Sequence, residues 1–210
     1  MRPGTASKTK GHPWFAALYD PMNRLGERRM MEPLRRRTAG ATKGRVLEIG
    51  AGTGANFPYY QAVAQLVATD PDPFMLRRAR KRGRELGLAA ELFQCAGEAL
   101  PFANAAFDTV VATLVFCSVT DQARALAEVR RVLKPDGTFR FIEHVRAQDG
   151  RVARVQDLLT PIWRRCSAGC HLNRSTIAAI AAAGFRIVET QWPPAPLPLL
   201  PFVTGVAVPA

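Results

Sequence analysis

The sequence has no long apolar run and few cysteines. No window of the 210 residues approaches the roughly 20 apolar residues that a helix needs to span a bilayer. The four cysteines are irregularly spaced, which excludes a disulfide framework and favours a reducing compartment. The first 13 residues are basic but have no apolar core, so they are not typical of a secretory signal. The chain is therefore expected to be cytoplasmic.

Acidic residues are also scarce, with 17 Asp and Glu against 29 Lys and Arg and a formal net charge of +12. Such a charge favours anionic phospholipid surfaces or nucleic acid, and it is equally typical of solvated helix faces. The basic residues are spread over predicted helices in regions 28–37, 77–85 and 146–165. The length, with 48% hydrophobic and 22% charged residues, indicates one folded domain with short additions.

Apolar runs alternate with amphipathic segments along the chain. Strands are expected at 44–50, 65–70, 90–95, 138–145, 186–191 and 202–208, with a further strand opening the segment 106–119. Helices are expected at 14–37, 55–63, 72–86, 121–137, 152–166 and 173–185. The proline-rich residues 192–201 are interpreted as an extended connector. This alternation predicts an α/β fold with a doubly wound, mostly parallel sheet, and it leaves room for antiparallel pairing at its end.

Three glycines at alternate positions, Gly50, Gly52 and Gly54, follow the first predicted strand. Ligands of such sheets bind beyond the carboxyl ends of the strands. Gly50 permits the tight turn, and Gly52 and Gly54 are expected to let backbone N–H groups approach a ligand at a helix N-terminus. The G-x-G-x-G spacing differs from the G-x-G-x-x-G of dinucleotide sites, which disfavours a nicotinamide-dependent oxidoreductase. Asp70 ends the next strand, where its carboxylate either accepts both hydroxyls of a ribose or caps a helix.

Four blocks, "VLEIGAGTGANF", "ATDPDPFML", "FDTVVATLVFCSV" and "EVRRVLKPDGTFRFIEHV", together resemble the class I S-adenosylmethionine-dependent methyltransferases. "TLVFCSV", "FIEHV" and "GCHLNR" are similar to the membrane-associated alkyl-thiol methyltransferases and their bacterial relatives. The resemblance implies a seven-stranded Rossmann-like sheet. Residues 1–40 would be a helical extension or lid, and residues 41–210 the S-adenosylmethionine-binding domain. It also implies methyl transfer to a small apolar acceptor, with a thiol sulfur favoured.

The resemblance assigns a cofactor role to the following residues: Glu48, Gly50, Ala51, Gly52, Gly54, Asp70, Pro71, Gly97, Glu98, Thr113, Leu114 and Tyr19. The residues from Glu48 to Gly54 would surround the methionine portion, and Asp70 would hold the ribose. Many relatives have an Asp for the adenine amino group where this chain has Ala96, so that contact is assigned to backbone near Gly97 or to Glu98.

The last three of these residues complete the expected cofactor site. Thr113 and Leu114 would close over the sulfonium. Tyr19 either folds over the cofactor as a lid or packs in the core.

Few side chains are candidates for the acceptor side of the site. His144, at the end of a predicted strand, either takes a proton from the acceptor or satisfies loop carbonyls. Cys117 lies beside the expected methyl donor, and packing is its alternative role. The two cysteines and the histidine of residues 166–171 have no second pair to complete a zinc site, so no metal is expected. We interpret them as a turn capped by Asn173 into the next helix, with Arg174 near the substrate opening.

Alternative acceptors remain open at this point. A thiol has a pKa near 8.5 and needs no strong base, whereas an amine or hydroxyl does. Phosphatidylethanolamine N-methylation and quinone-ring C- or O-methylation are the alternatives. A nucleic-acid partner is not expected, because "TLVFCSV" lacks the Asn/Asp-Pro-Pro-aromatic arrangement of base methylation. Residues 14–31 combine apolar side chains with arginines, so they either lie on an anionic membrane surface or pack against the sheet.

Overall fold

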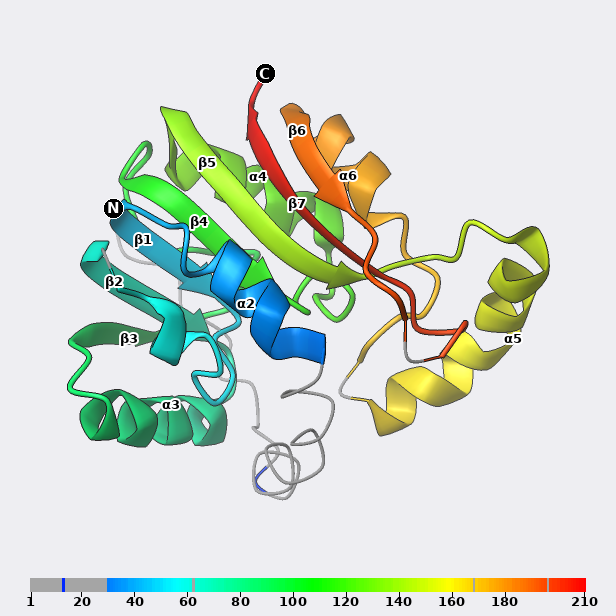
Figure 1. The fold of residues 1–210 in the computed structure, drawn as a ribbon, viewed down its shortest axis with the longest axis horizontal. Helices are drawn as coiled ribbons and strands as arrows, with labels where there is room; N and C mark the ends of the chain where they lie inside the picture. The colour runs from blue at the N-terminus through cyan, green and yellow to red at the C-terminus, as the bar shows by residue number, and fades with distance from the viewer. Residues whose placement is uncertain (1–12, 14–29, 62, 168, 196) are drawn as a thin grey trace.

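The computed structural model describes residues 13, 30–61, 63–167, 169–195 and 197–210. Its centre is a seven-stranded sheet of order β3-β2-β1-β4-β5-β7-β6 (Figure 1). The strands are β1 (Gly44–Ile49), β2 (Val63–Asp70), β3 (Ala90–Gln94), β4 (Phe107–Thr113), β5 (Leu133–His144), β6 (Phe185–Gln191) and β7 (Phe202–Pro209). The first five pair in parallel, and β7 runs antiparallel between β5 and β6. The predicted mostly parallel sheet is confirmed.

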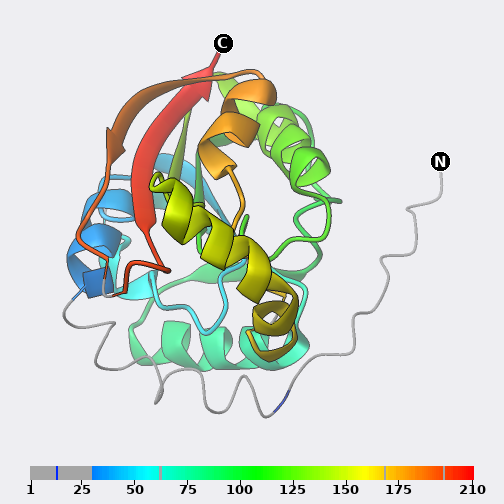
Figure 2. The same ribbon diagram turned by 90° about the vertical axis from the view of Figure 1, so that its right-hand side faces the viewer.

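Helices cover both faces of this sheet (Figures 1 and 2). They are α2 (Glu32–Thr38), the 3-10 turn η2 (Phe57–Tyr59), α3 (Pro73–Glu85), α4 (Gln122–Val132), α5 (Gly150–Cys166) and α6 (Thr176–Ala182). One face packs against α2, η2 and α3, and the other against α4 and α6. In Figure 1, α5 lies beyond one end of the sheet.

The central strands are apolar on both sides, which is why the sequence has continuous apolar runs there. Successive side chains of β4 point to opposite faces. Val110 packs in the cluster with α4, and Val111 packs in the cluster with α3. Both valines are fully buried, as expected for a parallel strand that is covered on both faces.

Two predicted helices differ from the structure. The helix expected at 55–63 is a single 3-10 turn, because Tyr60 is already extended (φ −76°, ψ 98°) and β2 begins at Val63. The helix expected to end at Pro135 and Gly137 ends at Val132 instead, and both residues lie inside β5. The chain becomes extended at Leu133, with a ψ of 137°, and this starts the strand two residues before the proline.

Several expectations fall on residues that the structure does not describe. Most of the helix expected at 14–37 and Tyr19 lie outside the described residues, and only α2 represents that region. Within the described ranges, no helix combines the length and apolar character needed to cross a bilayer.

Candidate functional site

The three glycines after β1 all have positive φ angles of 56° to 78°, but their surroundings differ. A Cβ on Gly50 would lie 2.6 Å from Cγ2 of Val115, and one on Gly54 would lie 2.8 Å from the Phe57 ring. A Cβ on Gly52 would meet no atom of the described residues within 4 Å. Packing therefore accounts for two of the glycines, and only Gly52 has an open side for a ligand.

Two backbone N–H groups of the loop donate hydrogen bonds to protein acceptors. The Gly54 N–H donates to the Ala51 carbonyl at 2.8 Å, and the Gly52 N–H donates to Oδ2 of Asp70 at 2.9 Å. The loop leads into η2 rather than an α-helix. The expected α-helix N-terminus is therefore absent at this loop, and the N–H groups of Gly52 and Gly54 already have protein acceptors, while the cofactor role of the two glycines stays a prediction.

Asp70 ends β2 beside the loop and is 8% exposed. Its Oδ1 accepts from the Asp72 N–H at 2.8 Å, and its Oδ2 accepts from Gly52. Burial raises the pKa of this carboxyl to about 6, against the lowering effect of the two amides. Each carboxylate oxygen has a second lone pair. The carboxylate next to the open side of Gly52 therefore fits a ligand that carries ribose hydroxyls.

Glu48 and Asn56 form a buried polar network beneath the loop. Asn56 Nδ2 donates to Oε1 of Glu48 at 2.8 Å and to Oγ1 of Thr113 at 3.0 Å. Asn56 Oδ1 accepts from Nη1 of Arg35, a buried arginine of α2, at 2.8 Å. Burial raises the pKa of Glu48 to about 7. This network joins the ends of β1 and β4 to α2, so it stabilises the conformation of the glycine loop.

The loop after β4 is held by a second buried carboxylate, that of Glu143. Its two oxygens accept hydrogen bonds from the backbone N–H groups of Val115, Phe116 and Cys117 at 2.9, 3.0 and 3.2 Å. Burial raises the pKa of this carboxyl to about 7. Glu143 therefore fixes the backbone beside the expected methyl donor and has no oxygen free of a protein partner.

Leu114 lies between Thr113 and this loop with a φ of 59°. A non-glycine residue in this region is strained by roughly 1–2 kcal/mol, and such strain is enriched at functional sites. The Leu114 N–H donates to the Ile142 carbonyl at 2.8 Å, which holds the residue at the end of the sheet. Thr113 and Leu114 thus lie on the same sheet edge as the glycine loop, where both were predicted.

The residues expected near the adenine have their own structural roles. Oε1 of Glu98 accepts from the N–H groups of Thr120 and Asp121 at 2.8 and 3.2 Å. Gly97 is buried, and a Cβ there would lie 3.3 Å from Cγ2 of Ile49. The Pro71 carbonyl accepts from Gln94 Nε2 at 3.2 Å. All three positions lie around the ends of β1 to β3, and their cofactor role stays a prediction.

His144 ends β5 and is 3% exposed. Its Nε2 lies 3.3 Å from the Leu199 carbonyl, and its Nδ1 lies 3.8 Å from Sγ of Cys170. Because a carbonyl only accepts, Nε2 carries a hydrogen, and Nδ1 is the ring nitrogen that faces the Cys170 thiol. One ring nitrogen therefore satisfies a loop carbonyl, which is one of the two roles expected for this histidine, and the other faces the Cys170 thiol. Proton acceptance from the methyl acceptor stays a prediction.

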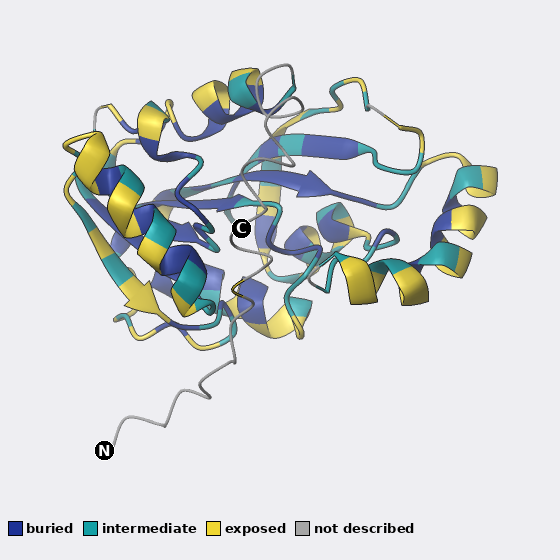
Figure 3. Cartoon of the chain, turned by 90° about the horizontal axis from the view of Figure 1, so that it is seen from below, coloured by how far each residue is buried: buried dark blue, intermediate teal, exposed yellow. Residues whose placement is uncertain are grey.

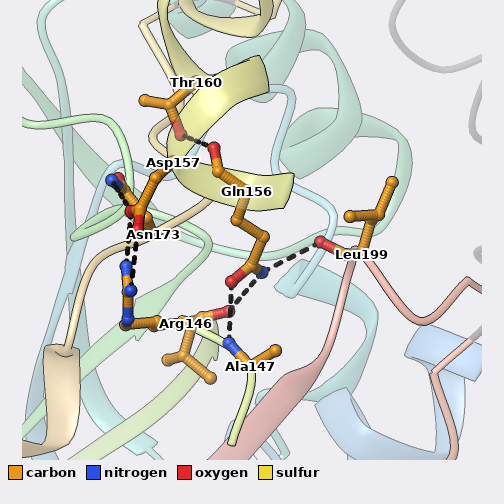
Figure 4. Close-up of polar contacts among 8 residues, drawn as sticks. Arg146, Ala147, Gln156, Asp157, Thr160, Asn173 and Leu199 are labelled. Carbon is orange, nitrogen blue, oxygen red and sulfur yellow. Dashed lines mark hydrogen bonds and ion pairs between the residues drawn. The ribbon is translucent and has the colours of Figure 1, made fainter. Parts of the chain in front are cut away.

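A buried glutamine of α5 shares the Leu199 carbonyl with this histidine. Gln156 Nε2 donates to Leu199 at 3.1 Å and to the Val145 carbonyl at 3.3 Å, and its Oε1 accepts from the Ala147 N–H at 2.8 Å (Figure 4). The glutamine side chain thus docks α5 onto the loops that follow β5 and precede β7. Helix α5 and His144 therefore contact the same carbonyl group, that of Leu199.

Contacts on the exposed side of α5 correct one sequence prediction. Asn173 Nδ2 donates to Oδ1 of Asp157 at 2.8 Å, and the Asp157 carboxylate also pairs with Arg146 at 2.5 and 2.8 Å (Figure 4). Helix α6 begins after Ser175 instead. Asn173 is therefore not a helix cap. Arg174 is partly buried and donates to the Phe116 carbonyl at 2.5 Å, so it braces the loop after β4.

Three residues of this site were missed or given other roles by sequence reasoning. Asn56 directly follows the glycine loop, and an amide that donates and accepts suits a link between a carboxylate and a guanidinium. Glu143 was noted only as the neighbour of His144. Cys170 was considered as a metal ligand and interpreted as part of a turn, and its contact with His144 depends on tertiary structure.

A cavity of about 350 Å³ lies elsewhere, between α2 and strands β5, β7 and β6. Arg37 and Glu189 line this cavity, and Nη2 of the arginine lies 3.5 Å from Oε1 of the glutamate. None of the predicted site residues lines it, so it is separate from the glycine-loop edge.

Comparison with known proteins agrees with this geometry. A family model described as a methyltransferase domain matches residues 47–141. The thiol S-methyltransferase TMT1B of Rattus norvegicus is 38% identical over 170 residues, which cover 78% of this chain and 70% of the relative. The phosphatidylethanolamine N-methyltransferase of Cereibacter sphaeroides is 33% identical over 180 residues, or 83% and 87% of the two chains.

A solved structure confirms the class of fold. Geranyl diphosphate methyltransferase in complex with S-adenosylmethionine superposes with a TM-score of 0.70 at 12% identity, covering 97% of this chain and 93% of that one. At this identity the likeness concerns the fold, which is the predicted Rossmann-like arrangement.

Proposed function

Because this chain belongs to the S-adenosylmethionine-dependent methyltransferases, in the group that includes the thiol S-methyltransferases, we propose that it methylates the thiol sulfur of a small apolar molecule. S-Adenosylmethionine is the cofactor. The choice of a thiol is our own inference, and it is based on the groups that border the acceptor side.

The observation that carries this choice is that, among the described residues on the acceptor side, no carboxylate is free and only Nδ1 of His144, a weak base, is left to take a proton. Glu143 uses both carboxyl oxygens for backbone amides, and His144 uses Nε2 for a carbonyl. A thiol with a pKa near 8.5 is partly ionised at neutral pH, whereas an ammonium or alcohol must lose its proton to a stronger base. The site therefore suits a thiol better than an amine or hydroxyl.

When bound, S-adenosylmethionine supplies a methyl group on a positively charged sulfur. We assign the ribose hydroxyls to Asp70, and we place the cofactor backbone against the open side of Gly52. Thr113 and Leu114 then border the methyl group. Val115 and Phe116 are buried next to them, which keeps water away from the reacting sulfur atoms. A dry site favours the reaction, because the opposite charges of thiolate and sulfonium disappear in the transition state.

We assign proton acceptance on this side to Nδ1 of His144. Since thiols ionise readily, the effect of His144→Gln is expected to depend on pH. We expect kcat to fall by only a few fold at pH 8.5 and by roughly tenfold or more at pH 6.5, where most of the acceptor is protonated. An equal loss at both pH values would assign His144 a structural role.

The test of the proposed function combines cofactor titration with a panel of acceptors. Calorimetry should detect S-adenosylmethionine binding to the wild-type protein and a large loss of affinity in Asp70→Ala. The purified protein is then incubated with the cofactor and with an alkyl thiol, a phosphatidylethanolamine vesicle or a quinol, and products are identified by mass. We expect the S-methyl thioether. Methylated phosphatidylethanolamine or quinol without thioether would refute the thiol assignment.

Phosphatidylethanolamine N-methylation remains the second candidate, since a relative of that name aligns with most of the chain. An ammonium acceptor would require deprotonation at a site where both oxygens of Glu143 are engaged. Quinone-ring methylation is the third candidate. The product analysis above separates all three reactions.

We further propose that the protein contacts an anionic membrane through α5. The helix has a buried side formed by Ala153, Gln156 and Thr160. On the opposite side, Val155, Leu158 and Ile162 follow helical spacing, and Leu158 and Ile162 are 76% and 63% exposed. Figure 3 shows this exposed side at the end of the molecule. Nothing in the described chain covers the stripe.

Arginines border this apolar stripe. At 3.6 residues per turn, Arg151, Arg154 and Arg165 fall beside Leu158 and Ile162, and all three are exposed. Apolar residues flanked by arginines favour the interface of an anionic bilayer, where apolar side chains enter and cations meet phosphates. Residues 14–31, the segment suggested by the sequence for this contact, lie mostly outside the described chain.

Membrane contact is tested by sedimentation with vesicles of phosphatidylcholine, with and without phosphatidylserine. We expect binding only with phosphatidylserine, and a decrease of tenfold or more in Leu158→Glu/Ile162→Glu, since full burial of each such side chain is worth about 1.5–3 kcal/mol. Val188→Glu is the matched control, because Val188 is also an exposed apolar residue but lies on β6. Equal loss in both variants, or unchanged binding, would refute a role for α5.

A further inference from the structure

Two thiols from distant parts of the chain meet beside the acceptor side of the site. Cys117 lies in the loop after β4, and Cys170 lies in the turn after α5. The His171 N–H donates to the Cys117 carbonyl at 2.7 Å, and a Cβ on Gly169 would lie 3.4 Å from the Ser118 carbonyl oxygen. The residues on both sides of Cys170 are thus held against Cys117 and its neighbour.

His144 completes this arrangement. Its Nδ1 lies 3.8 Å from Sγ of Cys170, while its Nε2 is oriented by the Leu199 carbonyl. A thiol, a basic ring nitrogen and a group that orients the ring are the parts of an activated cysteine nucleophile. Cys170 is partly exposed, whereas Cys117 is 3% exposed with its Sγ 3.6 Å from the Leu114 carbonyl. One thiol is accessible and the other is buried behind it.

The pKa values of the two thiols are shifted in opposite directions. Cys117 first, and then His144 and Trp163, lower the pKa of Cys170 to about 5 against the effect of burial. The Trp163 Nε1 is buried and has no hydrogen-bond partner within the described residues. Cys170 first, and then burial and Glu143, raise the pKa of Cys117. Arg174 is the cation that faces both groups.

We propose that Cys117 and Cys170 form a redox-active dithiol that reduces small organic disulfides. The Cys170 thiolate attacks one sulfur of the disulfide, the S–S bond breaks, and the first thiolate leaves. Cys117 then loses its proton to the departing thiolate or to solvent and attacks Cys170, so that a Cys117–Cys170 disulfide forms and the second thiolate leaves. Two electrons pass from the protein dithiol to the substrate, and an excess of a small thiol restores the dithiol.

This exchange does not depend on the proposed methyl transfer. One consequence does rest on that function: a thiol released at Cys170 emerges beside the methyl donor, so a disulfide precursor would be reduced and methylated at neighbouring positions. The dithiol is therefore tested without S-adenosylmethionine, and its failure would leave the methyl-transfer result unaffected.

The experiment uses the full chain with Cys166→Ser, which removes the exposed third thiol. Cys95 is buried, and burial raises its pKa to about 11, so it reacts slowly. The probe is 5,5′-dithiobis(2-nitrobenzoate) at one equivalent, which releases a coloured thiolate. We expect two thiolates per protein and a Cys117–Cys170 cross-link in peptide mass spectra. The further substitution Cys117→Ala should give one released thiolate per protein and leave half of the probe on Cys170 as a mixed disulfide.

The pH profile tests the activation of Cys170. When the pH is lowered from 8 to 6, the rate at which an ordinary thiol of pKa 8.5 reacts with the probe falls roughly 80-fold, because its thiolate fraction falls. The reaction rate of Cys170 should fall less than threefold. His144→Gln should restore a steeper profile. One thiolate per protein, no Cys117–Cys170 peptide or an ordinary pH profile would overturn the proposal. Methylation of Cys170 itself on adding S-adenosylmethionine would also overturn it, since the thiol would then be an acceptor. The cross-link is measured in the protein that retains Cys117 and His144, so the proposal is tested even if the Cys117→Ala or His144→Gln variant fails to fold.

Discussion

The difference between Gly50 and Gly52 gives the sharpest test of the cofactor loop. Both have positive φ angles, so alanine at either position costs roughly 1–2 kcal/mol in backbone strain. At Gly50 the new Cβ also lies 2.6 Å from Cγ2 of Val115, and such overpacking adds about 1–3 kcal/mol. Gly50→Ala should therefore lower the free energy of unfolding by roughly 2–5 kcal/mol, and Gly52→Ala by only about 1–2 kcal/mol.

Cofactor binding should follow the opposite order of sensitivity. The Cβ of Gly52→Ala enters the space that we assign to S-adenosylmethionine, so affinity should fall roughly 10- to 100-fold, the equivalent of about 1.4–2.8 kcal/mol. Denaturant unfolding measures the first effect, and calorimetric titration of the folded protein measures the second. Val115→Ala in the Gly50→Ala background should recover the steric part of the lost stability. Wild-type affinity in Gly52→Ala would show that its open side faces no ligand.

Two further predictions concern buried polar groups. Because burial raises the pKa of Glu48 from 4.5 to about 7, its stability contribution is full below pH 4.5 and is lost as pH rises through 7. Between pH 5 and pH 8 this one group should lower the free energy of unfolding by on the order of 2.5 kcal/mol. Glu48→Gln should reduce that pH dependence in denaturant unfolding, and an unchanged slope would contradict the assignment. Gln156→Ala leaves the Ala147 N–H and the Val145 carbonyl unpaired and removes one of the two donors to the Leu199 carbonyl, so it should cost about 2–4 kcal/mol in thermal or denaturant unfolding. Asp157→Asn, which weakens an exposed ion pair on the same helix, should change stability by less than about 1 kcal/mol, and an equal effect of the two substitutions would refute this account of Gln156.

The sheet was predictable because its central strands are covered on both faces. A run such as "TVVAT" in β4 has no charged side chain on either face, which favours a buried parallel strand or a buried helix. Its length and the glycine loop after β1 favour the strand. The C-terminal boundary of α4 was less predictable, because Pro135 suggests a helix stop, whereas the pairing of Leu133 with Phe107 starts the strand earlier.

The cofactor side of the site was also more predictable than the acceptor side. Gly52 and Asp70 lie 18 residues apart, and the parallel arrangement of β1 and β2 brings their positions together. Cys117 and Cys170 are separated by 53 residues and are joined only through the docking of the turn after α5. Sequence spacing carries no information on such a contact, so residues 166–171 were considered only for a metal and a turn.

The position of β7 in the sheet affects how the chain is made. In the described sheet, β6 pairs with β7 alone, although β6 comes first in the sequence. During synthesis, residues 185–191 leave the ribosome without a partner strand, and β5 presents an open edge until residues 202–209 follow. Unpaired edges of this kind favour association between chains. A nascent chain halted within the proline-rich connector is therefore expected to associate with other chains more readily than one in which β7 has paired with β5 and β6.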